Sequence, residues 1–252
     1  MSGPRIGVQL QQAEVGLAEL RDAWRRADEI GADSIWVWDH FFPIWTDPTG
    51  QHLEGWTLLA ALAADTSTAM VGTLVSSNSY RNPDLLADMA RTVDHISGGR
   101  AYLGLGSGWV QKDYDEYGYE FGTPGSRLAD LESSLPRLRE RLAALNPQPV
   151  GALPILIGGQ GEKVTLRIVA EHADAWNAMG SPDDYGRLNQ VLDDWCAEVG
   201  RDPGDIERTV LIDAFSVDHL DAYVDAGADH IIVMAMAPFD LAPLERLIEL
   251  RG

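Results

Sequence analysis

The sequence predicts a (β/α)8 (TIM) barrel, an α/β fold in which eight parallel strands close into a cylinder. Eight short apolar runs alternate with eight longer amphipathic segments along the 252 residues. The apolar runs are continuous, which is typical of parallel strands that are buried on both faces. Eight strand–helix repeats in about 250 residues is the number that such a barrel needs. A doubly wound open sheet is the alternative, and residues 1–252 are expected to form a single domain.

The predicted strands are short and rich in β-favouring side chains. The second of them, for example, contains Ile35, Trp36, Val37 and Trp38 in direct succession. Such runs of four to eight residues between polar or glycine-containing segments favour buried strands. In chain order, the predicted strands are residues 5–10, 34–38, 69–76, 100–106, 153–159, 174–179, 207–213 and 230–236.

The predicted helices show apolar residues at helical spacing and have recognisable boundaries. Gly31 ends the first helix, Pro83 opens the third at a first-turn position, and Gly98 follows its last turn. Pro136 is expected to kink the fourth helix, which follows a long loop. In chain order, the predicted helices are residues 17–31, 56–66, 84–99, 127–145, 162–173, 185–200, 218–228 and 241–250.

Composition and charge exclude several classes of function. The formal net charge is -20, and so acidic a surface repels polyanions, which argues against nucleic acid or an anionic membrane as partner. No apolar run approaches the ~18 residues of a membrane helix. The N-terminus leads directly into a strand without a signal-peptide pattern, so a cytoplasmic protein is expected. Cys196 is the single cysteine, and its helical context favours a buried structural thiol.

In a barrel of this kind, the chemistry lies where the strands end. Two of these ends are rich in glycine: GLGSGW at residues 104–109 and GGQGEK at residues 158–163. Glycine lets a ligand approach the backbone, and amides at the start of a helix form an anion site for which phosphate is the usual guest. Lys163, expected in the first turn of that helix, would add positive charge. Ordinary tight turns remain the alternative, and neither stretch has the spacing of a dinucleotide or P-loop motif.

Asp39 and His40 directly follow the second strand, and three interpretations were compared. A metal site needs further ligands at strand ends, and the remaining histidines lie elsewhere. A nucleophilic triad needs a serine or cysteine in an elbow turn, which is missing. The third interpretation is a hydrogen-bonding pair that faces a flat organic ligand, with Asp39 at its polar edge and His40 as donor or proton carrier. A capping aspartate beside a packed histidine remains possible.

Aromatic and hydroxyl side chains also gather near these ends. Trp36 and Trp38 are expected in the core, whereas Trp45 and Trp109 lie in loops where an indole can form a pocket wall. The Ser-Ser-Asn-Ser cluster after the third strand, with Ser76 and Asn78, can bond the carbonyl or ribityl oxygens of a ligand. A plain polar turn before Pro83 would explain the cluster equally well.

The segments WVWDHFFP, YRNPDLLADMARTVDHISGGRAYLGLGSGW and LPILIGGQGEKVTLRIVAEHADAWN together resemble the luciferase-like monooxygenase superfamily. More narrowly, they are similar to its branch of coenzyme F420-dependent oxidoreductases, over nearly the whole chain. The resemblance implies a luciferase-like (β/α)8 barrel with a deazaflavin or flavin in its mouth, and the Asp39-His40 pair against the ring. It implies a non-proline cis peptide at Leu74-Val75, beside Ser76, that backs the ring. The residues that it implies for the ribityl-phosphate tail are Gly106, Ser107, Gly108, Gly158, Gly159, Gln160 and Gly161.

Three departures from the family pattern limit what the resemblance implies. Sugar-phosphate dehydrogenases of the branch have a glutamate after the fourth-strand turn, where this chain has Trp109 and Val110. The acidic run that often follows is VQKDYDEYG here, with Asp113 as its remnant. The link between the fourth helix and the fifth strand is also shorter than usual, which would leave the mouth more open or change how a dimer partner covers it.

The resemblance implies hydride transfer between C5 of coenzyme F420 and a small organic substrate, with His40 as proton donor or acceptor. An FMN-dependent monooxygenase on the same barrel is the first alternative. A non-catalytic F420-binding carrier is another, from a different class. An aldolase or isomerase would need a catalytic lysine at a strand end, and Lys112 and Lys163 lie elsewhere. The resemblance also implies a homodimer.

Overall fold

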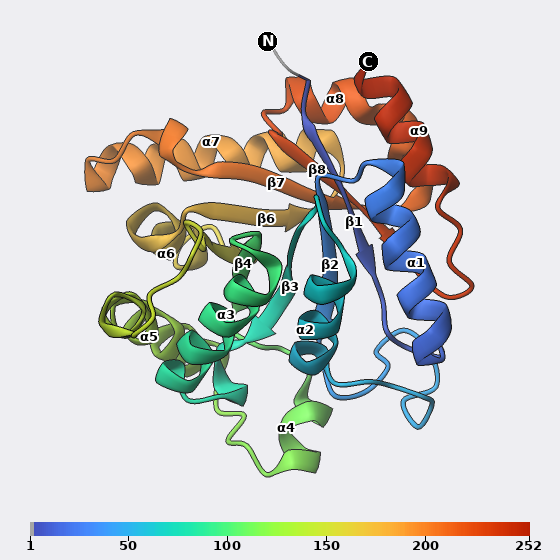
Figure 1. Cartoon of the computed structure of the whole chain (residues 1–252). Helices are drawn as coiled ribbons and strands as arrows, with labels where there is room; N and C mark the ends of the chain where they lie inside the picture. The colour runs from blue at the N-terminus through green and yellow to red at the C-terminus, as the bar shows by residue number, and fades with distance from the viewer. Residues whose placement is uncertain (1–2) are drawn as a thin grey trace.

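The computed structural model describes residues 3–252 and confirms the closed parallel barrel. Each strand pairs with the next in sequence, and β8 pairs with β1 to close the cylinder. Helices surround it, as Figure 1 shows. The strands are β1 (Arg5–Leu10), β2 (Ser34–Asp39), β3 (Met70–Ser77), β4 (Ala101–Gly106), β5 (Ile155–Gly158), β6 (Ala175–Met179), β7 (Glu207–Ile212) and β8 (His230–Ala235).

The helices follow the predicted order with two corrections, described below. Among the described residues, no helix has the length and apolar character needed to cross a membrane. The α-helices are α1 (Leu17–Ile30), α2 (Gly55–Asp65), α3 (Pro83–Ser97), α4 (Gln111–Tyr117), α5 (Pro124–Ala144), α6 (Thr165–His172), α7 (Pro182–Val199), α8 (Leu220–Asp225) and α9 (Ala242–Arg251). Short 3-10 turns are η1 (Asn78–Tyr80), η2 (Pro203–Asp205) and η3 (Ala214–His219).

The first correction is α4, which lies in the segment predicted as a long loop. It has only seven residues, without an apolar stripe, and ends at Gly118 in the left-handed conformation. Figure 1 shows α4 set apart from the helices around the barrel. The following helix, α5, starts at Pro124 and has a capping box from Thr123. It continues through Pro136 as one helix to Ala144.

The second correction concerns the glycine-rich turn after β5. We predicted a helix from residue 162, but α6 begins at Thr165. Glycines at 158, 159 and 161 disfavour helix, and Gly159 has a φ of 143°, which only glycine adopts readily. Lys163 is therefore exposed in the turn before the helix, not in its first turn.

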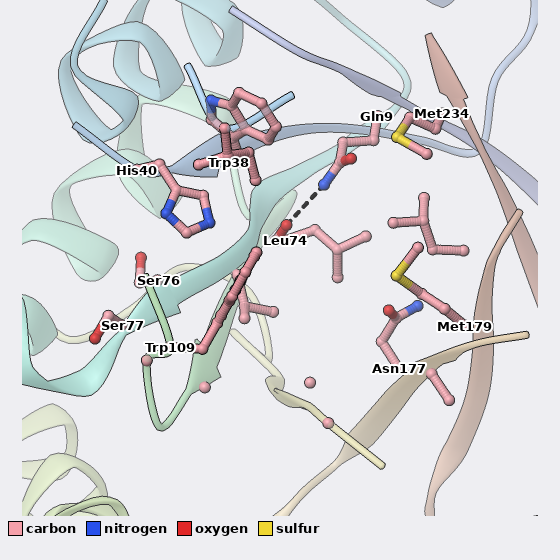
Figure 2. A pocket seen from close by; sticks show the side chains of 18 of the residues that line it. Gln9, Trp38, His40, Leu74, Ser76, Ser77, Trp109, Asn177, Met179 and Met234 are labelled. Atoms are coloured by element: carbon pink, nitrogen blue, oxygen red, sulfur yellow. Dashed lines mark hydrogen bonds between the residues drawn. The ribbon is translucent and has the colours of Figure 1, made fainter. Parts of the chain in front are cut away.

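A bulge interrupts β3 near its carboxyl end. The pairing of β3 with β4 shifts register between Gly72 and Ser76, and the peptide Leu74-Val75 is cis, as predicted. The buried side chain of Gln9, at the end of β1, donates to the carbonyl oxygen of Leu74 at 2.7 Å, shown as the dashed line in Figure 2. The bulge thus lies at the carboxyl end of the barrel and is held by β1, which is separated from β3 by β2 alone.

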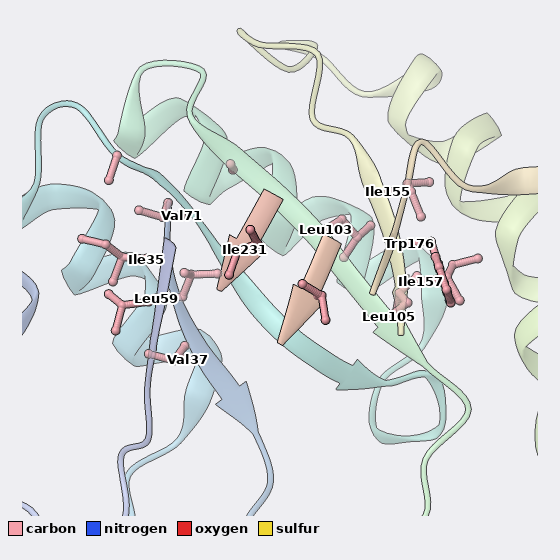
Figure 3. Packing of buried hydrophobic residues seen from close by; sticks show 14 of the residues in the cluster. Ile35, Val37, Leu59, Val71, Leu103, Leu105, Ile155, Ile157, Trp176 and Ile231 are labelled. Carbon is pink, nitrogen blue, oxygen red and sulfur yellow. The ribbon is translucent and has the colours of Figure 1, made fainter. Parts of the chain in front are cut away.

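The hydrophobic core has two layers, because side chains alternate between the two faces of each strand. Ile35 and Val37 of β2 point outward and pack with Leu59 of α2 and with outward residues of neighbouring strands (Figure 3). Trp36 points into the barrel and packs with Tyr102 at 5.0 Å between ring centroids. The predicted core position of Trp36 is therefore confirmed, and Cys196 is also buried in the outer layer.

A buried polar network closes the amino end of the barrel. Glu207 accepts hydrogen bonds from Arg5 at 2.8 Å and Tyr102 at 2.6 Å, and it lies 3.0 Å from Nδ1 of His230. The other ring nitrogen of His230 is 2.8 Å from the hydroxyl of Ser34. Since these groups bond one another at the strand starts, the open end that can admit a ligand is the carboxyl end.

The loop that leads from α2 into β3 is fixed by one carboxylate of α1. Asp28 accepts hydrogen bonds from the backbone N–H groups of Ser67, Thr68 and Ala69. Partial burial alone would raise its pKa, but these hydrogen bonds lower the pKa of Asp28 from 3.8 to about 2. Because the folded-state pKa is depressed, this contribution to stability is present above about pH 4 and is lost as the pH falls towards 2.

We expect Asp28→Ala to lower the free energy of unfolding by about 2 kcal/mol at neutral pH, because several amides lose a charged acceptor. Urea unfolding at pH 7 and at pH 3 measures the effect, which should be smaller at the lower pH. Asp22→Ala, at an exposed position of the same helix, is the control and should change little. An equal loss for both variants would contradict the assignment.

Candidate active site

A cavity of about 340 Å³ opens at the carboxyl end of the barrel. This volume lies in the range of small-molecule sites. Figure 2 shows His40, Leu74 and Trp109 on one side of it and Asn177 and Met179 on the other. Of the predicted site residues, those that line the cavity are His40, Leu74, Val75, Ser76, Gly106, Ser107, Gly108, Trp109, Gly158, Gly159 and Gln160.

His40 has a carboxylate partner that the sequence did not reveal as such. Its Nδ1 lies 2.7 Å from Oδ2 of Asp113, a side chain with 0% exposure in the first turn of α4. Because an ionised carboxylate only accepts hydrogen bonds, we assign the proton to Nδ1 of His40. In the neutral imidazole, Nε2 then carries the lone pair, and this is the nitrogen free to act on a ligand in the cavity.

Asp113 is itself held by two donors. The hydroxyl of Tyr80 donates to Oδ2 at 2.6 Å, and the backbone N–H of Phe41 donates to Oδ1 at 3.2 Å. Burial, together with the hydrogen bond to Asp113, raises the pKa of Tyr80, so this hydroxyl stays protonated and remains a donor. The carboxylate is therefore fixed in position and has three partners, counting His40.

We expect Asp113→Asn to change the tautomer of His40. If the amide oxygen of the new side chain keeps the hydrogen bond from the backbone N–H of Phe41, its NH2 group takes the place of Oδ2, faces Nδ1 of His40 and favours the proton on Nε2. Ring ¹⁵N chemical shifts of labelled protein report the tautomer directly. Asp115→Asn, at an exposed position of the same helix, should leave these shifts unchanged. An unchanged Nδ1–H tautomer in Asp113→Asn would refute the assignment.

Three loops above the barrel are joined by aromatic rings. Phe41, after β2, lies 4.5 Å from Tyr80 of η1 and 4.2 Å from Tyr117 of α4, measured between ring centroids. Tyr80 also stacks on Tyr119 at 5.7 Å. Such pairs stabilise by about 0.5–1.5 kcal/mol each beyond their buried area. We call these four side chains the aromatic bridge, since they connect the segments that follow β2, β3 and β4.

Asp39 does not lie where we predicted it. We expected its carboxylate at the polar edge of a ligand, but it is 1% exposed and absent from the cavity wall. It instead forms a two-point ion pair with Arg81 (Nη1–Oδ2 2.5 Å, Nη2–Oδ1 3.0 Å). Arg81 also donates to Glu54, the N-cap residue of α2, at 2.6 Å. Neighbouring residues at a strand end point to opposite sides, so His40 faces the cavity while Asp39 faces the helices.

Trp38 is buried, as predicted, at 4% exposure, and it also lines the cavity. Its indole N–H donates to Nε2 of His52 at 2.9 Å, and its ring meets His40 edge-on at 5.6 Å. Burial lowers the pKa of His52 to about 4, so this imidazole is neutral at pH 7 and accepts the bond. Trp38 is thereby fixed as a wall between the two histidines.

The glycine turns leave room around the β3 bulge. A Cβ atom at Gly106 would stand 2.9 Å from Cγ2 of Val75, and one at Gly158 would stand 3.1 Å from its Cγ1. Gly108 has a φ of 82°, and a Cβ there would meet the hydroxyls of Tyr114 and Ser77. Side chains at these positions would crowd the bulge and reshape the cavity.

Two further predicted residues lie outside the cavity wall. Asn78 is 7% exposed and begins η1, below the rim. Gly161 is exposed in the turn before α6, whose delayed start carries it away from the cavity. Ser76, in contrast, lines the cavity and accepts a hydrogen bond from the indole of Trp56 at 2.8 Å.

The geometry agrees with the comparisons to known proteins. A family model described as luciferase-like monooxygenase matches residues 1–249. The chain belongs to the luciferase-like monooxygenase family. The resemblance drawn from the sequence motifs is therefore confirmed.

Curated relatives of this luciferase-like chain include F420-dependent enzymes. An F420-dependent glucose-6-phosphate dehydrogenase of Amycolatopsis mediterranei is 32% identical over 137 residues, which is 54% of this chain and 41% of the relative. A 5,10-methylenetetrahydromethanopterin reductase of Methanolobus tindarius is 27% identical over 236 residues, 87% of this chain and 68% of the relative. The chain thus spans less than half the length of the first of these relatives.

Solved structures of an F420-dependent enzyme and of a monooxygenase share the luciferase-like fold. An F420-dependent secondary alcohol dehydrogenase in complex with an F420-acetone adduct superposes with a TM-score of 0.86 at 16% identity, over 98% of each chain. The monooxygenase RslO1 from Streptomyces bottropensis gives 0.70 at 17% identity, over 98% of this chain and 97% of its own. At these identities the likeness establishes the fold.

Proposed function

We propose that the protein is a coenzyme F420-dependent oxidoreductase that transfers hydride between the deazaflavin and a small organic substrate. The observation that supports this best is the placement of His40, held by Asp113, on the wall of an otherwise uncharged cavity beside the β3 bulge. When bound, the deazaflavin supplies hydride transfer at C5 of its ring. The F420-dependent relatives described above add support.

The residues of the cavity fit such a cofactor. Gly106 and Gly158 leave the bulge at Leu74-Val75 uncovered, so a flat ring can rest there without meeting side chains from β4 or β5. The side-chain oxygen of Gln11 is buried in the cavity wall and has no hydrogen-bond partner among residues 3–252, so it can accept from a ring N–H. The residues proposed to hold the ring and tail are Leu74, Val75, Ser76, Gly106, Ser107, Gly108, Gly158, Gly159 and Gln160.

The chain's own residues have separate tasks in this proposal. His40 gives or takes the substrate proton at Nε2, while Asp113 keeps the other nitrogen protonated and stabilises the imidazolium. The indoles of Trp38, Trp45 and Trp109 exclude water from the reacting centre. Backbone amides of the glycine turns bind the phosphate of the tail, since the side chains there carry no charge.

Titration of the purified protein with F420, FMN and riboflavin tests the proposal. Because Trp38 and Trp109 line the cavity, a bound cofactor should quench tryptophan fluorescence. The dissociation constant from this quenching should be lowest for F420. Riboflavin, which has no phosphate, shows how much the tail contributes. Absence of binding by F420 would refute the proposal.

An FMN-dependent monooxygenase is the second candidate, favoured by the monooxygenase RslO1 with the same fold. Tighter binding of FMN, followed by oxygen consumption with reduced FMN and substrate, would select it. Cofactor binding without turnover of any tested substrate would select the non-catalytic carrier.

The proposal includes a homodimer, as the resemblance implies, and a place in the cytoplasm, as expected from the sequence pattern. Light scattering that gives the mass of a single 27.5 kDa chain would exclude the dimer.

A further inference from the structure

We propose that the substrate of this site is an uncharged, apolar molecule whose ring or alkyl group lies against the indoles of Trp45 and Trp109, and that carboxylates and phosphate esters are rejected. The inference rests on the proposed function and adds the substrate class to it. Two observations support it: indole rings are exposed at the rim of the cavity, and the charged side chains nearby are paired with other groups.

The rim carries a pair of exposed indoles beside His40. Trp45 is 57% exposed and Trp109 is 59% exposed, although both are large apolar side chains. Their ring centroids are 6.1 Å apart with the planes tilted by 35°. Trp109 also meets the ring of His40 edge-on at 5.9 Å. A substrate that reaches Nε2 of His40 therefore touches indole faces, and covering them removes apolar surface from water.

The wall of the cavity offers an anion no cation. Within residues 3–252, its lining contains no lysine, arginine, aspartate or glutamate, and His40 is the single ionisable side chain in it. Directly behind His40 lies the buried carboxylate of Asp113, which repels a second negative charge. The polar groups that complete the wall, such as Asn177, Gln9 and Ser76, are neutral.

Three cations that follow β3 and β4 are engaged with other groups. Arg81 binds Asp39 and Glu54. Arg127 donates to the carbonyl oxygens of Gly108 and Phe121. Lys112, on α4, lies 3.8 Å from Glu116 and packs over the ring of Phe42. With the amides of the glycine turns bound to the phosphate of the cofactor, a carboxylate or phosphate on the substrate would lose its hydration without gaining a cationic partner from the cavity wall.

For an alcohol of this class, the redox step balances without a further reactant. The C–H bond at the carbinol carbon breaks, and its hydride passes to the oxidised deazaflavin named in the proposed function. The O–H bond breaks as Nε2 of His40 takes the proton, and the carbon–oxygen double bond forms. The alcohol is thus oxidised to a ketone and the deazaflavin is reduced, and the reverse step consumes one hydride and one proton.

A matched pair of probes tests the substrate class. In 1-phenylethanol and mandelate the ring and the carbinol are the same, and a methyl group in the first is a carboxylate in the second. Calorimetry with the cofactor-loaded protein should give a dissociation constant for 1-phenylethanol about 30-fold or more below that of mandelate, because an unpaired buried charge is costly. Equal affinities, tighter binding of mandelate, or binding of neither would overturn the proposal.

Variants of the rim locate the binding surface. Trp45→Ala and Trp109→Ala should each raise the dissociation constant for 1-phenylethanol about tenfold. Both side chains are exposed, so the fold should tolerate the change. Phe215→Ala is the matched control, because Phe215 is 94% exposed on η3 and lies outside the cavity wall. Trp109→Arg adds a cation, so the affinity for 1-phenylethanol should exceed that for mandelate by a smaller factor, or fall below it. An unchanged preference in Trp109→Arg, or equal losses in Phe215→Ala, would contradict the assignment.

The design separates two kinds of failure. Quenching of tryptophan fluorescence by F420 is measured first, and its absence would refute the proposed function. If F420 binds but the charged probe matches the neutral one, the cofactor assignment stands and the substrate class is wrong.

Discussion

Replacing His40 by alanine should lower turnover by about 10²–10⁴-fold while the protein still binds its cofactor. The imidazole is the single ionisable group of the cavity wall within the described residues, so no neighbour can take over the proton. Its Nδ1 is occupied by Asp113, which leaves Nε2 for the substrate. Single-turnover reduction of F420, followed by absorbance, measures the step directly.

Two controls separate a lost proton carrier from a lost fold. His95→Ala, on the exposed face of α3, should retain full turnover. Added imidazole should restore part of the activity of His40→Ala, because the vacated space beside Trp38 and Trp109 can admit it. Full turnover in His40→Ala, with unchanged cofactor affinity, would remove this residue from the mechanism.

Arg81→Met should lower the free energy of unfolding by about 3–5 kcal/mol, the largest stability effect that we expect in this protein. The change leaves the carboxylate of Asp39 buried, at 1% exposure, without its two-point partner. It also removes a donor from Glu54, the N-cap of α2. Urea unfolding followed by circular dichroism measures the loss.

The pH dependence of this loss has a definite sign. Burial raises the pKa of Asp39, and in the native protein the charge of Arg81 opposes that rise. In Arg81→Met the largest interaction that opposes burial is lost, so the folded state favours protonated Asp39. A group whose folded pKa is raised gives stability that is complete below its unfolded pKa of 3.8 and is lost as the pH rises through the folded value. The deficit of Arg81→Met should therefore shrink as the pH falls towards 4.

A second substitution separates the buried charge from lost packing. Asp39→Asn combined with Arg81→Met removes both charges and should recover at least half of the loss. If the double variant is as unstable as Arg81→Met alone, the unpaired carboxylate is not the cause. The stem of Arg81, which also covers apolar surface, would then be responsible.

The fold was predictable because its signals are local. Each signal lies within a short stretch of sequence: continuous apolar strands, helical periodicity, and glycine or proline at the boundaries. Eight repeats of the strand–helix unit then indicated a closed barrel. Where these local signals conflicted or were short, prediction was wrong. The three glycines at 158–161 delayed α6 to Thr165, and α4 was too short to show an apolar stripe.

The site was only partly predictable, because its key contacts are long-range. His40 and the glycine turns follow from their places after strands, and the structure brings them to one cavity. The partner of His40, however, lies 73 residues away in sequence, and Asp39, which we predicted at the edge of a ligand, binds Arg81 instead. An acidic residue in the first turn of the segment after β4, such as Asp113, was the one available signal. Only the packing of α4 over β2 decides which carboxylate meets the imidazole.

The aromatic bridge has a consequence for altering this protein by design. Phe41, Tyr80, Tyr117 and Tyr119 rest on one another across three separate connections. A library that randomises one of the segments after β2, β3 and β4 would disturb the other two, because their aromatic rings pack against it. The position of Asp113 would then change as well. New specificities should therefore be sought by transplanting the three segments together onto a barrel whose amino end is left unchanged.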